Sequence, residues 1–212
     1  MGTYYRNVEK YLDKIDRGVW VEIGTERGEG STRFFADLAK THATKFFAVD
    51  ADPDQIAISS ELLKVNGVIP EYINVINAKG EDFLGDLSQT IGDEKISLAY
   101  LDNFDWDYWL GRQEEPFVAG VKQNYIDKMQ VEMTNMNSQV THLAQAMWLV
   151  HMMADNSIII CDDTWFHPHE GVFIGKCSAA IPYLILNGYE IIHNEGYRQN
   201  SGAILARFSR NA

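Results

Sequence analysis

Seven short runs of β-branched and other apolar residues recur along the chain, and most of them are separated by stretches with a helical repeat. The expected strands cover residues 19–23, 45–49, 71–76, 96–101, 157–161, 189–193 and 203–208. Strands that alternate with helices form a mostly parallel sheet, because each helix carries the chain back to the same end of the sheet. This order predicts an α/β fold with helices on both faces.

Helical stretches fill the gaps between the first five expected strands. They cover residues 31–41, 53–66, 80–91 and 121–154. Pro53 suits the first turn of the second helix, since proline lacks an amide hydrogen that would be unpaired there, and Asp52 before it is the expected cap. The fourth stretch is longer than one crossover needs, so it must contain a break.

Three polar residues are candidates for that break, namely Asn135, Asn137 and Ser138, the last two as helix caps. We therefore expect a crossover helix at 138–153 and an extra helix at 121–133, inside an insertion at about 112–137. Three methionines of this region either pack in the core or line a pocket or subunit contact, and an apolar helical stripe favours the core. They are Met129, Met133 and Met136.

The last two expected strands are joined only by residues 194–202, a turn-rich segment too short for a crossover helix. They should pair antiparallel. The predicted fold is a Rossmann-like, seven-stranded, mostly parallel sheet with a C-terminal antiparallel hairpin. A length of 212 residues with 46% hydrophobic residues fits one domain, residues 1–212.

The turn after the first expected strand is rich in glycine. Gly24, Gly28 and Gly30 follow the strand in the spacing G-x-x-x-G-x-G and lead into a helix. Glycines let the backbone take positive φ and approach a ligand closely. The spacing differs from the dinucleotide fingerprint, and the Gly-Lys-Ser/Thr ending of a phosphate loop is absent. The turn predicts a ligand that is not bound through phosphate; a tight turn without a ligand is the alternative.

Residues Glu22 to Ser31 resemble the first motif of the class I S-adenosylmethionine-dependent methyltransferases, an acid in the strand followed by this glycine spacing. Asp50 follows the second expected strand, about twenty residues beyond the glycines, where an acid can bind ribose hydroxyls. Its alternative role is a turn or helix cap. The resemblance implies that the cofactor meets Glu22, Gly24, Thr25, Gly28, Gly30, Ser31, Asp50, Ala51, Asp102 and, near the adenine, Glu81 or Asp82. Helix-start acids beside the dipole are the alternative for the last two.

Acidic residues also follow the fourth and fifth strands. Asp102, Asp162 and Asp163 should converge at the carboxyl ends of neighbouring strands, where they would repel one another. A divalent metal would relieve that repulsion, and oxygen ligands favour magnesium, manganese or calcium. Acids that cap loops or helices are the alternative.

These acids make the chain similar to metal-dependent small-molecule O-methyltransferases of the catechol and macrocin types. Those enzymes carry Leu-Asp after strand four and Asp-Asn or Asp-Asp after strand five, which Asp102, Asp162 and Asp163 match. The catechol type has a lysine base three residues beyond the first aspartate, whereas this chain has Asp105 there. The catalytic candidates are Asp102, Asp105 and His167, with His142, His169 and Lys176 as further proton acceptors. Aromatic residues at the same rim, either pocket walls or packing residues, are Trp106, Tyr108, Trp109, Trp165 and Phe166.

The formal net charge of −12 argues against nucleic acid as a partner, because the surface repels polyphosphate. The sequence shows no signal peptide and no membrane-spanning stretch, so we expect a cytoplasmic location and no membrane partner. The predicted function is methyl transfer from S-adenosylmethionine to a hydroxyl of a small molecule, with a divalent metal such as magnesium. A metal-independent N- or C-methyltransferase and a catalytically silent binding module remain open, as does a homodimer.

Overall fold

The computed structural model describes residues 4–65, 67, 71–109, 111–112, 114–196 and 201–209. Parts of three predicted segments lie outside the described residues: Asn66 at the end of the second helix, residues 110 and 113 around the start of the insertion, and residues 197–200 of the last turn. The sheet has seven strands in the order β3-β2-β1-β4-β5-β9-β8. Their bounds are β1 Val19–Ile23, β2 Phe46–Asp50, β3 Ile73–Asn77, β4 Ile96–Leu101, β5 Met153–Asp162, β8 Glu190–Glu195 and β9 Gly202–Arg207.

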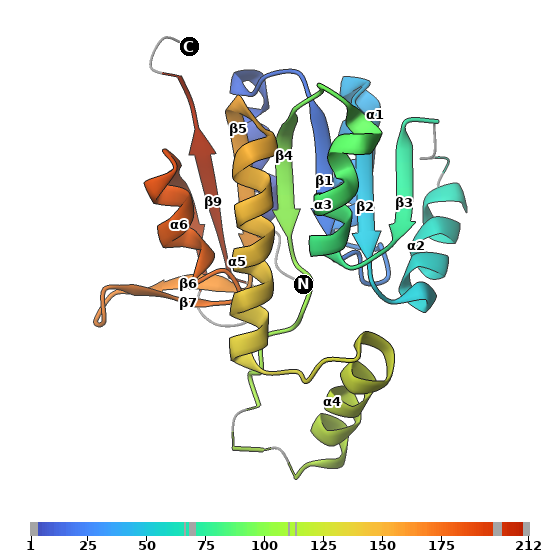
Figure 1. The fold of residues 1–212 in the computed structure, drawn as a ribbon, viewed down its shortest axis with the longest axis vertical. Helices are drawn as coiled ribbons and strands as arrows, with labels where there is room; N and C mark the ends of the chain where they lie inside the picture. The colour runs from blue at the N-terminus through green and yellow to red at the C-terminus, as the bar shows by residue number, and fades with distance from the viewer. Residues whose placement is uncertain are drawn as a thin grey trace.

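The sheet confirms the predicted fold class. Strands β3, β2, β1, β4 and β5 are parallel, while β9 runs antiparallel between β5 and β8. The strand order reverses between β1 and β4, because the chain first builds outward to β3 and then returns to the other side of β1 (Figure 1). A crevice at the carboxyl ends of β1 and β4 is the expected ligand site of such a sheet.

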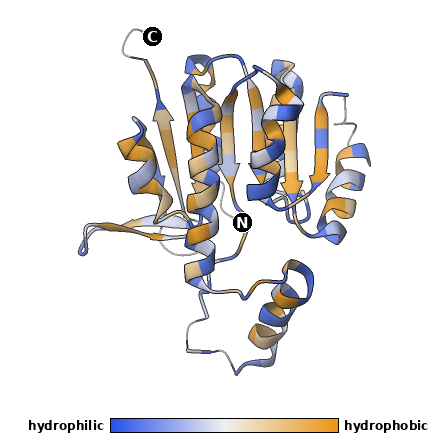
Figure 2. Cartoon of the chain, viewed as in Figure 1, coloured by the Kyte–Doolittle hydropathy of each residue, from blue (hydrophilic) through white to orange (hydrophobic). Residues whose placement is uncertain are grey.

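Helices cover both faces of the sheet, and each face has its own apolar core. One core is covered by α3 Gly80–Ile91, α5 Asn135–Met152 and α6 Ala180–Leu186. The other is covered by η1 Tyr4–Lys14, a 3-10 helix, with α1 Ser31–His42 and α2 Pro53–Val65. The strands are largely apolar and the helices carry polar residues on their outer sides (Figure 2). Among the described residues, the helices are too short or too polar to cross a membrane.

The predicted extra helix is α4 Pro116–Met129, which starts five residues earlier than expected. It lies beyond the carboxyl ends of the strands, apart from the helices that cover the sheet (Figure 1). The prediction overlooked that Pro116 suits a first helical turn, so it placed the start of the helix too late. The helix ends at Gln130, which has a left-handed φ of 56°.

The caps predicted for the following helix, Asn137 and Ser138, are wrong. The Thr134 hydroxyl accepts a hydrogen bond from the Asn137 amide at 3.1 Å, so Thr134 is the cap and α5 begins at Asn135. Asp52 does cap α2, since its Oδ1 accepts from the Asp54 amide at 2.9 Å.

A short hairpin that the sequence did not predict follows the fifth strand. It consists of β6 Thr164–His167 and β7 Val172–Gly175, which pair antiparallel outside the main sheet (Figure 1). Gly175 has a φ of 112°, and a Cβ atom there would overlap the carbonyl oxygen of Asp163. The hairpin can therefore return its end to the tip of β5, which brings Lys176 to that point.

Candidate cofactor and acceptor site

The chain leaves β1, β4 and β5 through residues with unusual backbone angles. Glu26, Phe104 and Asp163 have φ values of 45°, 51° and 44°, in the left-handed region that residues other than glycine seldom adopt. Two further non-glycine residues in this region, Ala43 and Gln130, simply end helices. Strained residues tend to cluster at functional sites, and these three surround the point where the strand order reverses.

The glycine turn after β1 packs against neighbouring backbone. Gly24 and Gly28 have positive φ, as predicted, at 99° and 76°. A Cβ at Gly24 would lie 2.5 Å from the Asn103 amide nitrogen, and one at Gly28 would lie 3.0 Å from Ser59 in α2. Gly30 instead has a φ of −98° and caps α1. The first two glycines are needed for close packing of the turn against β4 and α2 as well as for its shape.

Two cavities lie side by side at this end of the sheet. The β2-side pocket has a volume of about 280 Å³ and is bounded by the ends of β1, β2 and β4, the start of α3, and α4. The β5-side pocket has a volume of about 380 Å³ and lies between the glycine turn and the ends of β4 and β5. Three acidic residues line both pockets: Glu26, Asp102 and Asp105.

The residues expected to bind a cofactor, from the resemblance to methyltransferases, are distributed between the two pockets. Those in the β2-side pocket are Gly24, Asp50, Ala51, Glu81 and Asp102. Those in the β5-side pocket are Thr25, Gly28, Gly30, Ser31 and, again, Asp102. Glu22 lies buried and lines neither pocket, and Asp82 is exposed on α3 and lines neither. Met129 lines the β2-side pocket rather than the core, while Met133 is buried and Met136 is exposed.

Asp50 at the end of β2 is held by backbone amides. Its Oδ2 accepts hydrogen bonds from the amides of Thr25 at 2.9 Å and Glu26 at 3.2 Å, and its Oδ1 accepts from the Asp52 amide at 2.9 Å. Burial raises the pKa of Asp50, and these hydrogen bonds oppose the rise. The carboxylate therefore fixes the glycine turn beside the β2-side pocket.

Glu22 lies beneath the turn with its side chain fully buried. Within the described part of the chain, neither carboxyl oxygen makes a hydrogen bond of good geometry. Burial raises the pKa of Glu22 to about 8; the charges of Asp102 and Asp50 add to the rise, while the nearby hydroxyls of Ser31 and Thr32 oppose it. Glu22 is thus a mainly protonated acid at neutral pH.

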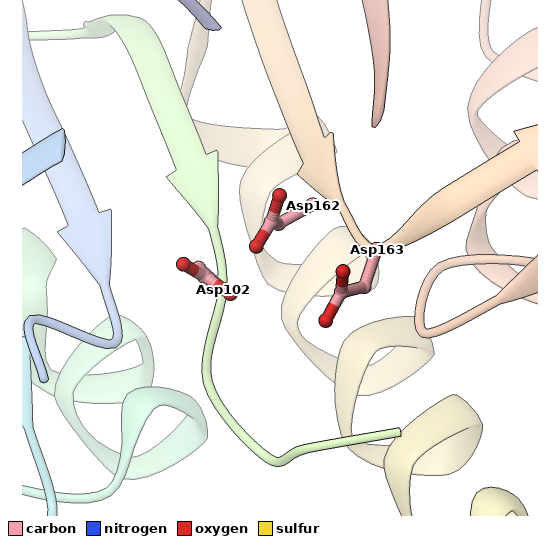
Figure 3. Close-up of side chains that lie close together, drawn as sticks. All are labelled: Asp102, Asp162 and Asp163. Atoms are coloured by element: carbon pink, nitrogen blue, oxygen red, sulfur yellow. The ribbon is translucent and has the colours of Figure 1, made fainter. Parts of the chain in front are cut away.

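Asp102, Asp162 and Asp163 converge, as expected from the strand order. Asp102 follows β4, Asp162 ends β5 and Asp163 is the next residue (Figure 3). One carboxylate oxygen from each lies within 4.8 Å of the other two. The Tyr100 hydroxyl also donates to Asp102 Oδ2 at 3.1 Å.

A buried lysine lies among these three carboxylates. Lys176 Nζ is 2.8 Å from Asp102 Oδ1, 3.3 Å from Asp163 Oδ2 and 4.0 Å from Asp105 Oδ1, and the residue is 1% exposed. Sequence reasoning named Lys176 only as a further proton acceptor. Its position depends on the β6–β7 hairpin, so nothing in the local sequence could have revealed this contact.

The charges of this cluster follow from burial and from the ammonium. Burial acts to raise the pKa of Asp102, but the Lys176 charge and hydrogen bonds from its neighbours hold the pKa below its usual value. Burial and the charge on Asp102 raise the pKa of Asp162 well above its usual value. Burial alone would lower the pKa of Lys176, yet the surrounding aspartates raise it. The ammonium of Lys176 thus offsets part of the negative charge of the three aspartates.

The residues present do not fit a divalent metal. Hard cations such as Mg²⁺ and Ca²⁺ bind oxygen ligands, and at least one or two of these are ionised carboxylates in direct contact with the ion. Here the ammonium of Lys176 already contacts two of the three carboxylates that a metal would need, Asp102 and Asp163. The repulsion that led the sequence argument to a metal is relieved by a side chain of the protein itself.

Aromatic rings form much of the remaining wall of the β5-side pocket. They belong to Tyr5, Tyr100, Trp106, Tyr108 and Trp109. Trp165 stacks on Tyr108 with ring centroids 6.3 Å apart, behind this wall. The pocket thus combines flat apolar surfaces with carboxylates.

Two histidines expected as proton acceptors lie away from the pockets. His167 is on β6, with its ring 6.1 Å from that of His169, and does not line either pocket. His142 is buried in α5, where its Nδ1 is 2.7 Å from the Ser138 carbonyl oxygen. Burial lowers the pKa of His142 to about 4, so it is neutral at pH 7.

Comparison with known proteins shows the same fold in several methyltransferases. No protein-family model and no curated protein sequence matches the chain. A Streptococcus mutans protein solved in complex with SAH has a TM-score of 0.57 at 11% identity, over 98% of this chain and 99% of its own. An rRNA methylase from Streptococcus thermophilus gives 0.55 at 14% identity, over 96% and 95%. The glycopeptide N-methyltransferase MtfA gives 0.54 at 9% identity, over 98% and 96%.

These identities are low, so the likeness establishes the fold alone. The similar proteins act on acceptors of different kinds, including rRNA and a glycopeptide. The fold therefore leaves the acceptor open, and the expected exclusion of nucleic acid must be argued from this chain's own charge.

Proposed function

We propose that this chain, as one domain with α4 as an insertion, binds S-adenosylmethionine in the β2-side pocket and transfers its methyl group to a hydroxyl of a small molecule in the β5-side pocket. The observation that carries this proposal is the shared wall of the two pockets. Glu26, Asp102 and Asp105 line both, so a group bound in one pocket can meet a group bound in the other. In-line alignment of donor and acceptor is the main catalytic need of a methyl transfer.

The β2-side pocket suits an adenosine with a positively charged tail. Asp50 would accept hydrogen bonds from the ribose hydroxyls. Glu81 lies at the start of α3, where the resemblance to methyltransferases implies an acid near the adenine. Ile23, Val49 and Ala78 provide apolar contact for a base. The three shared acids place negative charge where a sulfonium would lie.

The shared wall also supplies a proton acceptor. S-adenosylmethionine supplies the methyl group on a sulfonium that needs no further activation. Asp105 is the proposed base, because it lines both pockets and its contact with Lys176 is long, at 4.0 Å. Asp102 is already engaged by Lys176 and Tyr100, so its proposed role is to orient and to balance charge. His167 has no role in this scheme.

An amine is the second candidate acceptor. Carboxylates and aromatic faces together favour a cation, and both line the β5-side pocket. The same carboxylates and the net charge of −12 disfavour a phosphate-rich acceptor such as RNA. We therefore propose a small molecule as the acceptor in either case, without a divalent metal.

Binding and turnover test this function separately. Calorimetry should show that the wild type binds S-adenosylmethionine and S-adenosylhomocysteine. Transfer of a labelled methyl group should then be followed with hydroxylated molecules, amines and RNA as acceptors. Asp105→Asn should slow transfer about 100-fold or more, since it removes the proposed base, and should weaken cofactor binding much less, through loss of one of the three charges near the sulfonium.

Asp82→Asn is the matched control, because this aspartate is exposed on α3 and lines neither pocket. It should change neither binding nor transfer. Failure to bind the cofactor would overturn the proposal. Cofactor binding with no transfer to any acceptor class would identify a silent binding module instead.

A further inference from the structure

We infer that the ammonium of Lys176 is the permanent cation of this site. It occupies the position at which the resemblance to O-methyltransferases predicts a divalent metal. The inference about the cation stands on the geometry of the aspartates, and its consequence for turnover rests on the proposed function. The predicted metal ligands are present in the chain, but a side chain of the same chain occupies their common contact point.

The backbone on both sides of Lys176 is fixed to the tip of β5. The Lys176 amide donates to the Asp163 carbonyl oxygen at 3.2 Å, and the Cys177 amide donates to Thr164 Oγ1 at 3.0 Å. The Thr164 hydroxyl in turn donates to the Asp162 carbonyl oxygen at 2.8 Å. Gly175 permits the close approach that these hydrogen bonds require. The hairpin therefore holds the lysine against the same residues that its ammonium neutralises.

The ammonium cannot simply swing out to admit a metal. Lys176 has a side chain that is 2% exposed, whereas Lys128, which pairs with Asp52 and Asp54, is 30% exposed. A dication between Asp102 and Asp163 would have to share their oxygens with a positive charge already in contact, and two like charges at that distance repel strongly in a buried site. A permanent organic cation therefore excludes the metal.

This arrangement makes Lys176 a positioning residue. It contacts Asp102 through both the carboxylate and the carbonyl oxygen, at 2.8 Å and 3.3 Å. Asp102 lines both pockets, so the lysine sets the place of an acid at the wall between them. In such a site the lysine neutralises the carboxylates, so no metal ion has to bind for the charges to be balanced.

The test is a titration of Mg²⁺ and Mn²⁺ against thermal stability, with sodium chloride at equal ionic strength as reference. The wild type should show no metal-specific rise in Tm. Lys176→Gln removes the charge but keeps a polar side chain, and it should melt at a lower temperature without metal. In the presence of about 1 mM Mn²⁺ it should regain several degrees, because the freed carboxylates now bind the ion.

Lys128→Gln is the matched control, because it also separates a lysine from two aspartates but leaves Lys176 in place. It should gain no metal response. Adding Asp102→Asn to Lys176→Gln should abolish the gained response. A folded Lys176→Gln protein that gains no metal response would overturn the inference.

A second measurement covers the case in which Lys176→Gln does not fold. Binding of Mn²⁺ to the wild type, followed by electron paramagnetic resonance, should show no tight site, and methyl transfer should persist after exhaustive chelation. Tight binding that Asp102→Asn removes would overturn the inference. The thermal titration and the Mn²⁺ binding measurement do not depend on cofactor affinity, so failure of this inference can be told apart from failure of the proposed function.

Discussion

The two pockets hold their carboxylates by different means. In the β2-side pocket, Asp50 is fixed by backbone amides of residues that follow β1 and β2. In the β5-side pocket, Asp102 is held mainly by side chains, above all by Lys176, which lies 74 residues further along the chain. Backbone amides form part of the turn itself, whereas a side-chain partner is lost with one substitution. The first pocket is therefore the more robust and the second the easier to break.

The largest expected effect comes from breaking the β5-side arrangement at its backbone. Gly175→Ala would place a Cβ atom against the Asp163 carbonyl oxygen at a φ of 112°. We expect a loss of about 2–5 kcal/mol in the free energy of unfolding, from overpacking and backbone strain together. Chemical denaturation would measure it.

Gly171→Ala in the same hairpin is the control, since its φ is 67° but no atom lies within 4 Å of the added Cβ. It should cost about 1–2 kcal/mol from strain alone. Equal losses in the two variants would mean that the close approach to Asp163 contributes nothing.

Glu22, beneath both pockets, offers a pH-dependent test. Its folded pKa of about 8 lies above the ordinary 4.5, so the folded state binds the extra proton between these values. The stabilising contribution of this proton to the free energy of unfolding is fully present below pH 4.5 and is lost as pH rises toward 8. Glu22→Gln lacks this loss, so its stability relative to wild type should increase by about 1.4 kcal/mol per pH unit, or about 3 kcal/mol over two units.

Unfolding of the apoprotein at several pH values would measure the difference. Glu29→Gln serves as control, because this side chain is half exposed on the same turn and pairs with Arg27 at the surface. It should show no such slope. A constant difference between Glu22→Gln and wild type at every pH would mean that Glu22 is ionised in the fold.

The smallest expected effect comes from removing Asp50, the carboxylate that backbone amides hold in the β2-side pocket. Asp50→Ala should weaken binding of S-adenosylmethionine by about 1–3 kcal/mol, through loss of a charged hydrogen-bond acceptor and of the amide contacts that hold the turn. Calorimetry would measure the affinity, and thermal unfolding would measure stability in parallel. Lower stability with unchanged affinity would assign Asp50 to the turn alone.

The sequence was sufficient for most of the fold because the strands and helices repeat a local pattern. Val19–Ile23 and Ile96–Leu101 were predicted at their observed bounds, and the antiparallel C-terminal pair followed from a short connection. The β6–β7 hairpin was missed because its strands have only four residues each, too few for a periodic signal. The start of α5 was misplaced because several polar residues before it can all serve as caps.

The site was predictable where it depends on strand ends and not where it depends on distant packing. The convergence of Asp102, Asp162 and Asp163 follows from the parallel order of β4 and β5. The ammonium among them does not, because Lys176 reaches them through a hairpin with no sequence signature. The packing of Gly28 against Ser59 likewise depends on how α2 meets the turn. Charge balance in a buried cluster is a property of the assembled fold.

Helix α4 is held against the rest of the protein mainly by polar contacts. Val118 is its one buried residue among those described, and polar contacts join it to the rest of the protein: Lys122 with Asp107, Lys128 with Asp52, and the Tyr125 hydroxyl with the Asp105 amide. Tyr125 and Met129 line the β2-side pocket, so a shift of α4 would move one wall of that pocket. Partly exposed ion pairs weaken as salt rises, whereas apolar packing does not. The position of this wall of the pocket should therefore respond to ionic strength.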